Sequence, residues 1–528
     1  MMNEFQQTLN KVNSLQQTEN GATGYSTSGQ NLVDLNFRVP SNHNNVTMDD
    51  IKAFVNALNE DEVTAVKWLF YLRDVREGLG ERDSFVNLFI TLYSYDKDAA
   101  LKVLPLVPEF GRWKDIVDIL ARTEDSSDIS NAICSLISEQ IREDLVNMQA
   151  GKSVSLLAKW LPSINASKKA RKVAVRIAKS LELYNEAYRK MLSSLRRYID
   201  VTEVKTCSDR WNEIDYNKVS SNANARYVKA FLKHDPERRK KYLDALLAPM
   251  PTASAVMHAS NLYPHEVYAK YNSGHRWNRP AAVADQGIEA LWVNLKNIPT
   301  TGNTMVVCDG SGSMETTIKG ANNIMAIDVS RSLSIFFSER NTGEYKDKVI
   351  EFSATPRYID LSGCKTLADK YNTMNRFDDC SNTNLQLVFD LLLDTAIKNK
   401  VPQSDIPQRI LIVSDMEFDR ACEYTPSRYG AFMGDHNDIM AKYRTLFETI
   451  KQKWVAAGYT MPDIVFWNVN SRTQTLPVSS NEAGVILVSG FSVNNVKMVL
   501  SGEMNPWTAL KSVLDSERYK VIEDVLKA

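Results

Sequence analysis

The stretch VVCDGSGSM, residues 306–314, decides how the C-terminal half of this 528-residue chain is expected to fold. It closes an apolar run over residues 304–308 and leads, through Asp309, Ser311 and Ser313, into a helical pattern over residues 322–340. Carboxylate and hydroxyl oxygens on a loop between a strand and a helix suit a small, hard divalent cation such as Mg²⁺. The stretch therefore predicts a strand, a cation-binding loop and a helix, and it indicates binding rather than turnover.

Strand-length apolar runs and helical patterns alternate after residue 301. The runs cover residues 349–352, 410–414, 464–469 and 485–488, and the helical patterns cover 385–398, 437–457 and 493–500. This alternation predicts a doubly wound parallel sheet with helices on both faces, in which ligands bind at the carboxyl ends of the strands. Asp415 ends one run as Asp309 ends another, so the two carboxylates are expected to face one ion.

The preceding part of the chain shows helical patterns instead of strand-length apolar runs. Short amphipathic patterns, broken by turn residues, follow one another from residue 48 to about residue 264 and predict stacked helical hairpins, an α-solenoid. Residues 1–47 are polar and are expected to form an arm with at most one short helix. The predicted domains are thus an arm (1–47), a helical domain (48–300) and a sheet domain (301–528).

Composition excludes several classes of protein. Hydrophobic residues make up 44% and charged residues 24%, as in folded soluble proteins, and the net charge is −1. Residues 161–250 nevertheless hold 20 Lys and Arg against 10 Asp and Glu, which fits either a polyanion-binding surface or a solvated helical face. Six cysteines without CxxC pairing, no apolar signal core and no apolar run of about 18 residues predict a cytoplasmic protein that does not span a membrane.

The Asp-x-Ser-x-Ser loop resembles the metal-ion-dependent adhesion site of von Willebrand factor A domains. That resemblance implies a bound Mg²⁺, or another divalent cation such as Mn²⁺ or Ca²⁺, held by three loops. Asp309, Ser311 and Ser313 match the first loop, Thr383 the second and Asp415 the third. The hydroxyl-rich ligand set leaves the ion short of negative charge, so it recruits a further oxygen, often a partner's carboxylate. Glu417 and Asp419 lie beside this site and are read as solvated loop charges, with a supporting role at the ion as the alternative.

A second stretch, YLRDVREGLGER at residues 71–82, resembles the Ro autoantigen class of RNA-binding proteins. In that class a ring of HEAT-like helical repeats, the TROVE domain, is closed by a von Willebrand A domain. The resemblance is closer to an uncharacterised bacterial and phage branch of the same architecture. It is carried there by residues 111–113 (GRW), 157–162 (LAKWLP), 226–231, 234–235, 263–266 (YPHE) and 487–491 (LVSGF). It implies a cytoplasmic ribonucleoprotein scaffold, in the host cytoplasm if the gene is phage-borne.

The same resemblance favours RNA as the partner, either a small structured RNA or a single-stranded end. Cations that could follow its phosphates are Arg73, Arg76, Arg82, Lys168, Lys169, Arg171, Lys172, Arg196, Arg197, Arg238, Arg239, Lys240 and Lys241. Tyr188, Tyr198, Trp211, Tyr216 and Tyr227 lie among them, as stacking platforms or as core residues.

Two other functions are weighed against RNA binding. One is a protein assembly module that captures a partner carboxylate at the ion. The other is a nuclease using Asp309, Asp415 and Glu417 around Mg²⁺. The sequence favours a protein without catalysis, because Ser311 stands where a haloacid-dehalogenase phosphatase needs its second Asp. Hydrolase-elbow, P-loop and His-Glu-x-x-His motifs are also absent from the sequence.

Overall fold

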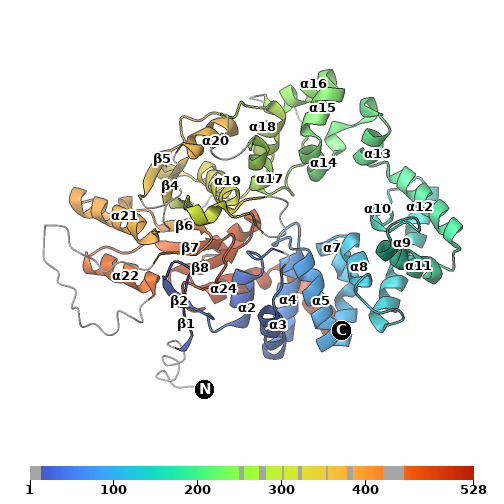
Figure 1. Ribbon diagram of the computed structural model, residues 1–528, viewed down its shortest axis with the longest axis horizontal. Coiled ribbons are helices and arrows are strands. Elements are labelled where there is room, and N and C mark those ends of the chain that lie inside the picture. Colours follow the sequence, from blue (N-terminus) through green and yellow to red (C-terminus); the bar gives the residue numbers. More distant parts are fainter. Residues whose placement is uncertain are drawn as a thin grey trace. The chain divides into compact units, whose positions relative to one another are not determined.

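The computed structural model describes residues 13–43, 45–248, 255–272, 281–299, 302–318, 324–352, 355–376, 384–419 and 445–528 (Figure 1). The chain folds into two compact units. The sheet unit comprises Met1–Asn45 and Leu262–Asp515, and the helical unit comprises Val46–Asn261 and Ser516–Ala528. These boundaries differ from the predicted ones at three points: the N-terminal residues and residues 262–300 join the sheet unit, and the last helix joins the helical unit.

Six strands form the sheet of the sheet unit (Figure 1). Their order is β5 (Arg357–Asp360), β4 (Lys348–Phe352), β3 (Thr304–Asp309), β6 (Arg409–Ser414), β7 (Asp463–Asn468) and β8 (Val485–Ser489). All neighbours are parallel except β5, which runs antiparallel to β4 at the edge. Every residue of β3 is buried, which explains why this strand reads as a continuous apolar run. A helix-rich chain with a mostly parallel C-terminal sheet is therefore confirmed.

The order of the connections places a topological switch point between β3 and β6. From β3 the chain passes through α19 (Ala326–Glu339) to β4, and it later returns through α21 (Leu385–Asn399) to β6 on the other side of β3. Parallel crossovers are right-handed, so steps in opposite directions put α19 and α21 on opposite faces of the sheet. Ligands of such sheets bind at the carboxyl ends of the strands beside the switch point. Asp309 and Asp415 lie at these two strand ends.

The N-terminal segment is built into the sheet unit and is not a polar arm. β1 (Leu15–Gln17) and β2 (Thr23–Tyr25) form a hairpin, and α2 (Asn31–Arg38) packs on β8. Tyr25 and Leu476 exchange two backbone hydrogen bonds of 2.8 and 2.9 Å. Such main-chain pairing leaves no trace in composition, which is why the hairpin was not predicted.

The sheet unit contains further helices among its described residues: α17 (Pro264–Tyr268), α18 (Gln286–Val293), α20 (Leu367–Asn375), α22 (Leu446–Ala456), α23 (Val496–Val499) and α24 (Pro506–Leu514). Of these, α22 lies between β6 and β7 in the chain. α17 packs on α19, so the segment after residue 262 belongs to this core. The predicted helix over residues 437–457 corresponds to α22, and its first part lies outside the described residues.

The helical unit consists of short helices joined by short loops. They are α3 (Met48–Glu60), α4 (Glu62–Arg73), α5 (Asp83–Tyr95), α6 (Lys97–Val103), α7 (Val107–Phe110), α8 (Trp113–Leu120), α9 (Asp128–Gln149), α10 (Leu157–Trp160), α11 (Lys168–Ser180), α12 (Asn185–Ile199), α13 (Thr202–Cys207), α14 (Ser221–Arg226), α15 (Val228–His234), α16 (Pro236–Leu247) and α25 (Glu517–Lys527).

The last helix of the chain, α25, is held in the helical unit by polar and aromatic interactions. Arg518 pairs with the buried Asp74 at 2.9 Å, and the ring of Tyr519 meets that of Tyr71 edge-on at 5.9 Å. Within the described ranges, no helix has the length and apolar character that crossing a bilayer requires.

Candidate cation site

Asp309 and Ser414 bring the ends of β3 and β6 together. The pairing of Cys308 with Val413 sets Asp309 level with Ser414, and the Ser414 hydroxyl donates a 2.5 Å hydrogen bond to Asp309 Oδ2. The other carboxylate oxygen, Oδ1, accepts the backbone N–H of Ser311 at 2.9 Å. Both oxygens of a fully buried carboxylate are thus oriented by neutral donors, and its charge is not neutralised by them.

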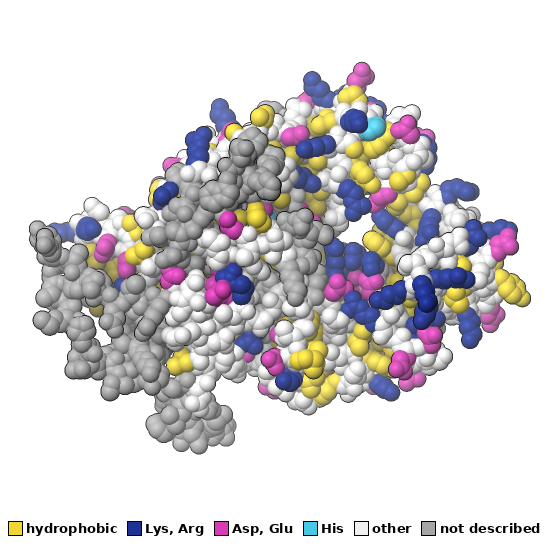
Figure 2. Space-filling view, in the orientation of Figure 1, with side chains coloured by type: hydrophobic (Ala, Val, Ile, Leu, Met, Phe, Trp, Pro, Cys, Tyr) yellow, Lys and Arg dark blue, Asp and Glu magenta, His cyan; other side chains and the backbone are white. Residues whose placement is uncertain are grey.

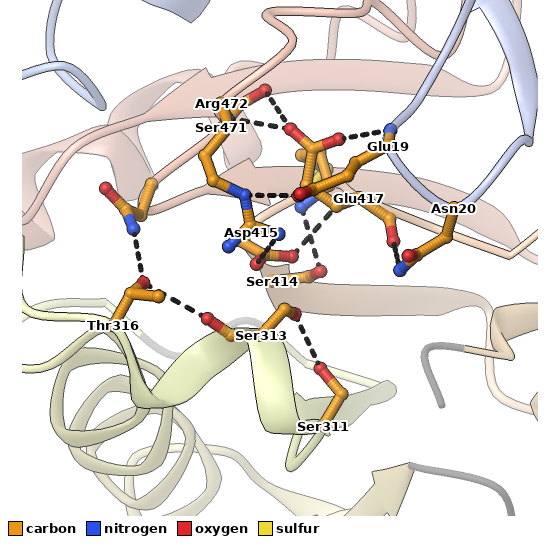
Figure 3. Close-up of polar contacts among 12 residues, drawn as sticks. Glu19, Asn20, Ser311, Ser313, Thr316, Ser414, Asp415, Glu417, Ser471 and Arg472 are labelled. Atoms are coloured by element: carbon orange, nitrogen blue, oxygen red, sulfur yellow. Dashed lines mark hydrogen bonds and ion pairs between the residues drawn. The ribbon is translucent and has the colours of Figure 1, made fainter. Parts of the chain in front are cut away.

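The Gly-Ser-Gly-Ser loop then turns its two hydroxyls toward each other. Ser311 Oγ and Ser313 Oγ lie 3.0 Å apart, as two ligands of one ion would (Figure 3). Ser311 is fully buried, whereas Ser313 is half-buried, so the open side of the site lies at Ser313. Gly310 is required at its position because a Cβ there would lie 2.7 Å from a carboxylate oxygen of Glu351.

Asp415 supplies the second carboxylate. It is fully buried directly after β6, and its Oδ1 accepts the backbone N–H of Glu417 at 3.2 Å. Its Oδ2 accepts no hydrogen bond from the residues that the structure describes. Arg472 Nη2 lies 3.6 Å from this oxygen, and Figure 3 shows the two residues side by side.

Burial shifts the acidity of both carboxyls in the same direction. Burial first, and the charge of the neighbouring Asp415 second, raise the pKa of Asp309 to about 7 against the opposing effect of the Ser414 and Ser311 donors. Burial also raises the pKa of Asp415, against the opposing effects of the Ser313 hydroxyl, the Glu417 N–H and the Arg472 charge. Two buried carboxyls that resist ionisation together favour a cation between them.

This donor set fits a hard divalent cation. Two hydroxyls and two carboxylates converge at the switch point, and Oδ2 of Asp415 accepts no hydrogen bond from the described residues. Oxygen ligands of this kind are what Mg²⁺ takes. Within the described part of the chain, no group of three or more His, Cys, Asp or Glu side chains is placed to hold a metal. Binding would therefore depend on the hydroxyls as well as the carboxylates. Thr383, the predicted ligand from the second loop, lies outside the described residues.

Glu417 corrects one expectation. We read it from the sequence as a solvated loop charge, but it is fully buried. Its Oε1 accepts the N–H groups of Arg472 and Thr473, each at 2.7 Å, and its Oε2 accepts the N–H of Glu19 at 2.9 Å. The hydroxyls of Ser471 and Thr473 donate to it as well. The carboxylate of Glu417 thus faces these loops, and its oxygens are occupied by donors.

Two of the cations predicted to bind RNA are buried in the helical unit, which corrects those assignments. Arg73 is fully buried and pairs with the equally buried Asp115 at 2.6 Å. Gly111 leaves room for this pair, because a Cβ there would lie 2.4 Å from Asp115 Oδ2. Arg239 is also fully buried, with its guanidinium 4.9 Å from the ring of Tyr216. Neither side chain can reach a phosphate in this structure.

Two further candidates use their guanidinium groups to donate hydrogen bonds to main-chain carbonyls. Arg196 donates to the carbonyls of Ala158 (2.9 Å) and Leu161 at the end of α10. Arg238 donates to the carbonyls of Asn212 and Ile214, each at 2.6 Å. Arg238 is nevertheless exposed, and Arg76 also donates to a main-chain carbonyl, that of Glu109 at 3.2 Å. The other exposed candidates are Arg82, Lys168, Lys169, Arg171, Lys172, Arg197, Lys240 and Lys241.

The predicted aromatic platforms are mostly core residues. Tyr188 is fully buried and its hydroxyl donates to the carbonyl of Pro162 at 3.0 Å, and Tyr216 belongs to the same hydrophobic cluster as Phe231. Trp211 packs against that cluster with its ring stacked on His234 at 4.4 Å. Tyr227 is partly buried there, and Tyr198 is exposed with its hydroxyl bonded to the carbonyl of Lys152.

The first turn of α11 carries four of the exposed cations, Lys168, Lys169, Arg171 and Lys172, with no acidic residue among them. In Figure 2, Lys and Arg side chains gather over the part of the helical unit formed by α9–α12. A helix N-terminus carries a partial positive charge, which repels cations placed beside it. The positive charges of the helix end and of the side chains together attract an anion.

Sequence reasoning missed Ser414, Arg472 and Glu19 as parts of the site, and it gave Glu417 a supporting role only as the alternative to a solvated loop charge. Ser414 could have been found, because it immediately precedes Asp415 at a strand end. Arg472 and Glu19 come from segments far from Asp415 in the chain, and no local pattern connects them to it.

Comparison with known proteins finds similarity in both halves of the chain. Residues 303–523 match the family described as a domain of unknown function (DUF7788), and residues 18–132 and 167–296 match another domain of unknown function (DUF2828). The chain is also similar to Uncharacterized protein L728 of Acanthamoeba polyphaga mimivirus, with 28% identity over 531 residues that cover 94% of this chain and 87% of that protein. Any functional assignment therefore depends on the geometry of the site.

Proposed function

We propose that this protein is a non-enzymatic, divalent-cation-dependent binding protein whose sheet unit is a von Willebrand A-type domain. Mg²⁺, or Mn²⁺ or Ca²⁺ in its place, would be held by Asp309, Ser311, Ser313, Asp415 and Thr383. The observation that carries the proposal is the convergence of two fully buried carboxylates and a pair of hydroxyls 3.0 Å apart at the switch point.

The ligand set decides what such an ion does. Hydroxyls are neutral, and only Asp309 and Asp415 bring negative charge, one of which is already offset by Arg472. The ion would keep affinity for one more anionic oxygen, approached from the open side at Ser313. A carboxylate or a phosphate of a partner supplies that oxygen, and neither requires a bond to be broken.

RNA is the partner we favour, with the exposed first turn of α11 as its contact surface. Four cations without a local counter-charge at a helix N-terminus are destabilising in the free protein, and phosphate oxygens would relieve that repulsion. In this proposal the helical unit is a HEAT-like, TROVE-like repeat domain of the Ro class, and the whole chain is a cytoplasmic ribonucleoprotein scaffold. The cysteines within the described residues, Cys134, Cys207, Cys308 and Cys364, are free thiols, as a reducing compartment would leave them.

The alternative is a protein assembly module that captures a partner carboxylate at the ion. A nuclease is less well supported, because the Glu417 carboxylate is occupied by hydrogen-bond donors.

One binding experiment separates these functions. Fluorescence anisotropy of a labelled structured RNA is followed with the full chain in Mg²⁺ or in EDTA, for the wild type, Asp309→Ala, and a variant with Lys168, Lys169, Arg171 and Lys172 replaced by Glu. The proposal predicts RNA binding that the α11 variant loses. Failure of the wild type to bind RNA, together with a protein partner retained only in Mg²⁺ and lost in Asp309→Ala, would support the assembly module. Shortening of the RNA during incubation with Mg²⁺ would support the nuclease.

A further inference from the structure

Three segments that are far apart in the chain meet beside Asp415, and Glu417 holds them together. Its carboxylate accepts the N–H of Glu19 from the N-terminal hairpin and the N–H of Arg472 from the loop after β7. The carbonyl of Glu417 accepts the Asn20 side-chain amide at 2.6 Å. The backbones that carry Glu19 and Arg472 are thereby fixed relative to the loop that carries Asp415 (Figure 3).

From these fixed positions, the Arg472 side chain lies between two carboxylates. Its Nε is 2.6 Å from Glu19 Oε2, and its Nη2 is 3.6 Å from Asp415 Oδ2. The two carboxylates differ sharply in their surroundings, since the Glu19 side chain is 55% exposed and that of Asp415 is fully buried. The closer contact is to Glu19, outside the site, and the longer one is to the buried oxygen that accepts no hydrogen bond within the described residues.

We propose that Arg472 is a tethered counter-cation that competes with the divalent ion for Asp415, and that Glu19 draws it away from the site. This inference rests on the proposed cation site. Without the ion, the guanidinium charge offsets the buried carboxylates. When the ion binds, the same charge repels it, and the ion pair with Glu19 retains Arg472 on the solvent side. Arg472 and Glu19 therefore set the cation affinity without being ligands, with opposite signs.

Charge at this distance is large enough to measure. A unit positive charge about 5–7 Å from a divalent ion, at the effective dielectric constant of a partly exposed site, changes its binding constant by ~10-fold or more. Removing the charge of Arg472 should therefore tighten Mg²⁺ binding by ~10-fold. Removing the charge of Glu19 leaves Arg472 with Asp415 as its remaining carboxylate partner, and should weaken binding by ~3-fold.

The test titrates Mg²⁺ into the full-length wild type, Arg472→Met, Arg472→Lys and Glu19→Gln, with calorimetry for affinity and thermal unfolding in EDTA as a second readout. Arg472→Met should bind Mg²⁺ more tightly and melt at a lower temperature in EDTA, because the buried carboxylates lose their counter-charge. Arg472→Lys, which keeps the charge, should return toward the wild type in both. Lys451→Met is the matched control, because it removes a comparable ion pair with Glu482 (3.1 Å) elsewhere in the sheet unit.

The outcomes separate this inference from the proposed function. If the wild type and all variants show no Mg²⁺ binding, the cation site itself is refuted. If the wild type binds Mg²⁺ but Arg472→Met binds it equally or more weakly, Arg472 is not a competitor and the inference is overturned. A Glu19→Gln variant that binds as tightly as Arg472→Met would also contradict it, because the two changes must act in opposite directions.

Discussion

Replacing Asp309 by Asn should stabilise the cation-free protein while abolishing its response to Mg²⁺. Asn has nearly the same shape and can still accept the Ser311 N–H, and its amide can donate to Ser414 Oγ. What the substitution removes is a fully buried negative charge beside Asp415. A buried charge that binds a ligand can lower the stability of the ligand-free protein. Its removal should therefore raise the stability while cation binding is lost.

The magnitude follows from the acidity of the carboxyl. Burial raises the pKa of Asp309 from 3.8 to about 7, and each pKa unit corresponds to ~1.4 kcal/mol. A raised pKa of an acid means that ionisation destabilises the fold, with the penalty growing as the pH rises from 3.8 and complete above 7. At pH 8 the penalty amounts to ~4 kcal/mol, part of which is shared with Asp415, so Asp309→Asn should gain about 2–4 kcal/mol in EDTA. For a unit of this size, that gain raises the melting temperature by roughly 4–8 °C.

Mg²⁺ should remove most or all of the stability advantage of Asp309→Asn. An ion at about 100 times its dissociation constant stabilises the wild type by ~2.7 kcal/mol and leaves the variant unchanged. Thermal unfolding at pH 8 in EDTA and in Mg²⁺ measures both effects, with the exposed Asp394→Asn as the control. A variant that melts below the wild type in EDTA, or gains as much from Mg²⁺, would refute the reasoning.

Three further predictions concern other parts of the chain. Burial, with a smaller effect of His43, lowers the pKa of His265 to about 3, so below pH 6.5 the unfolded chain takes up a proton that the folded chain excludes. Between pH 7.5 and 5.0 the wild type should therefore lose ~2 kcal/mol that His265→Gln does not lose, as measured by urea unfolding with the exposed His258→Gln as control. Arg73→Met leaves the buried Asp115 with only its longer ion pair to Arg112 (3.4 Å) and should lower the free energy of unfolding of the helical unit by ~3 kcal/mol. The exposed Arg82→Met should change it by less than about 0.5 kcal/mol, and equal losses would show that the buried ion pair of Arg73 does not stabilise the fold. Charge reversal of the four cations in the first turn of α11 should weaken RNA retention in a filter assay and flatten its dependence on salt, and unchanged binding would exclude this surface.

The strands and the two carboxylates at their ends could be predicted because their signals are local. A buried parallel strand is a continuous apolar run, so β3 and β6 are visible in the sequence, and Asp309 and Asp415 follow directly from where the runs stop. The register, in which Cys308 pairs with Val413 and Asp309 lies beside Ser414, was seen only in the structure.

The surroundings of the site could not be predicted, because they depend on interactions between distant segments. Glu417 reads as a loop charge, yet its donors come from Glu19, 398 residues away, and from the loop after β7. Arg73 reads as a surface cation because only the fold brings Asp115 against it. Buried polar groups of this kind find their partners only through tertiary structure. In the sequence alone they look like exposed surface charges.

The most direct test of the central claim is a crystal structure of the full chain soaked with Mn²⁺, with anomalous scattering recorded at the manganese absorption edge. The account predicts one strong peak at the carboxyl ends of β3 and β6, within ligand distance of the Ser311 and Ser313 hydroxyls and absent in Asp309→Asn. A peak elsewhere with none at this position, or no peak at saturating Mn²⁺, would contradict it.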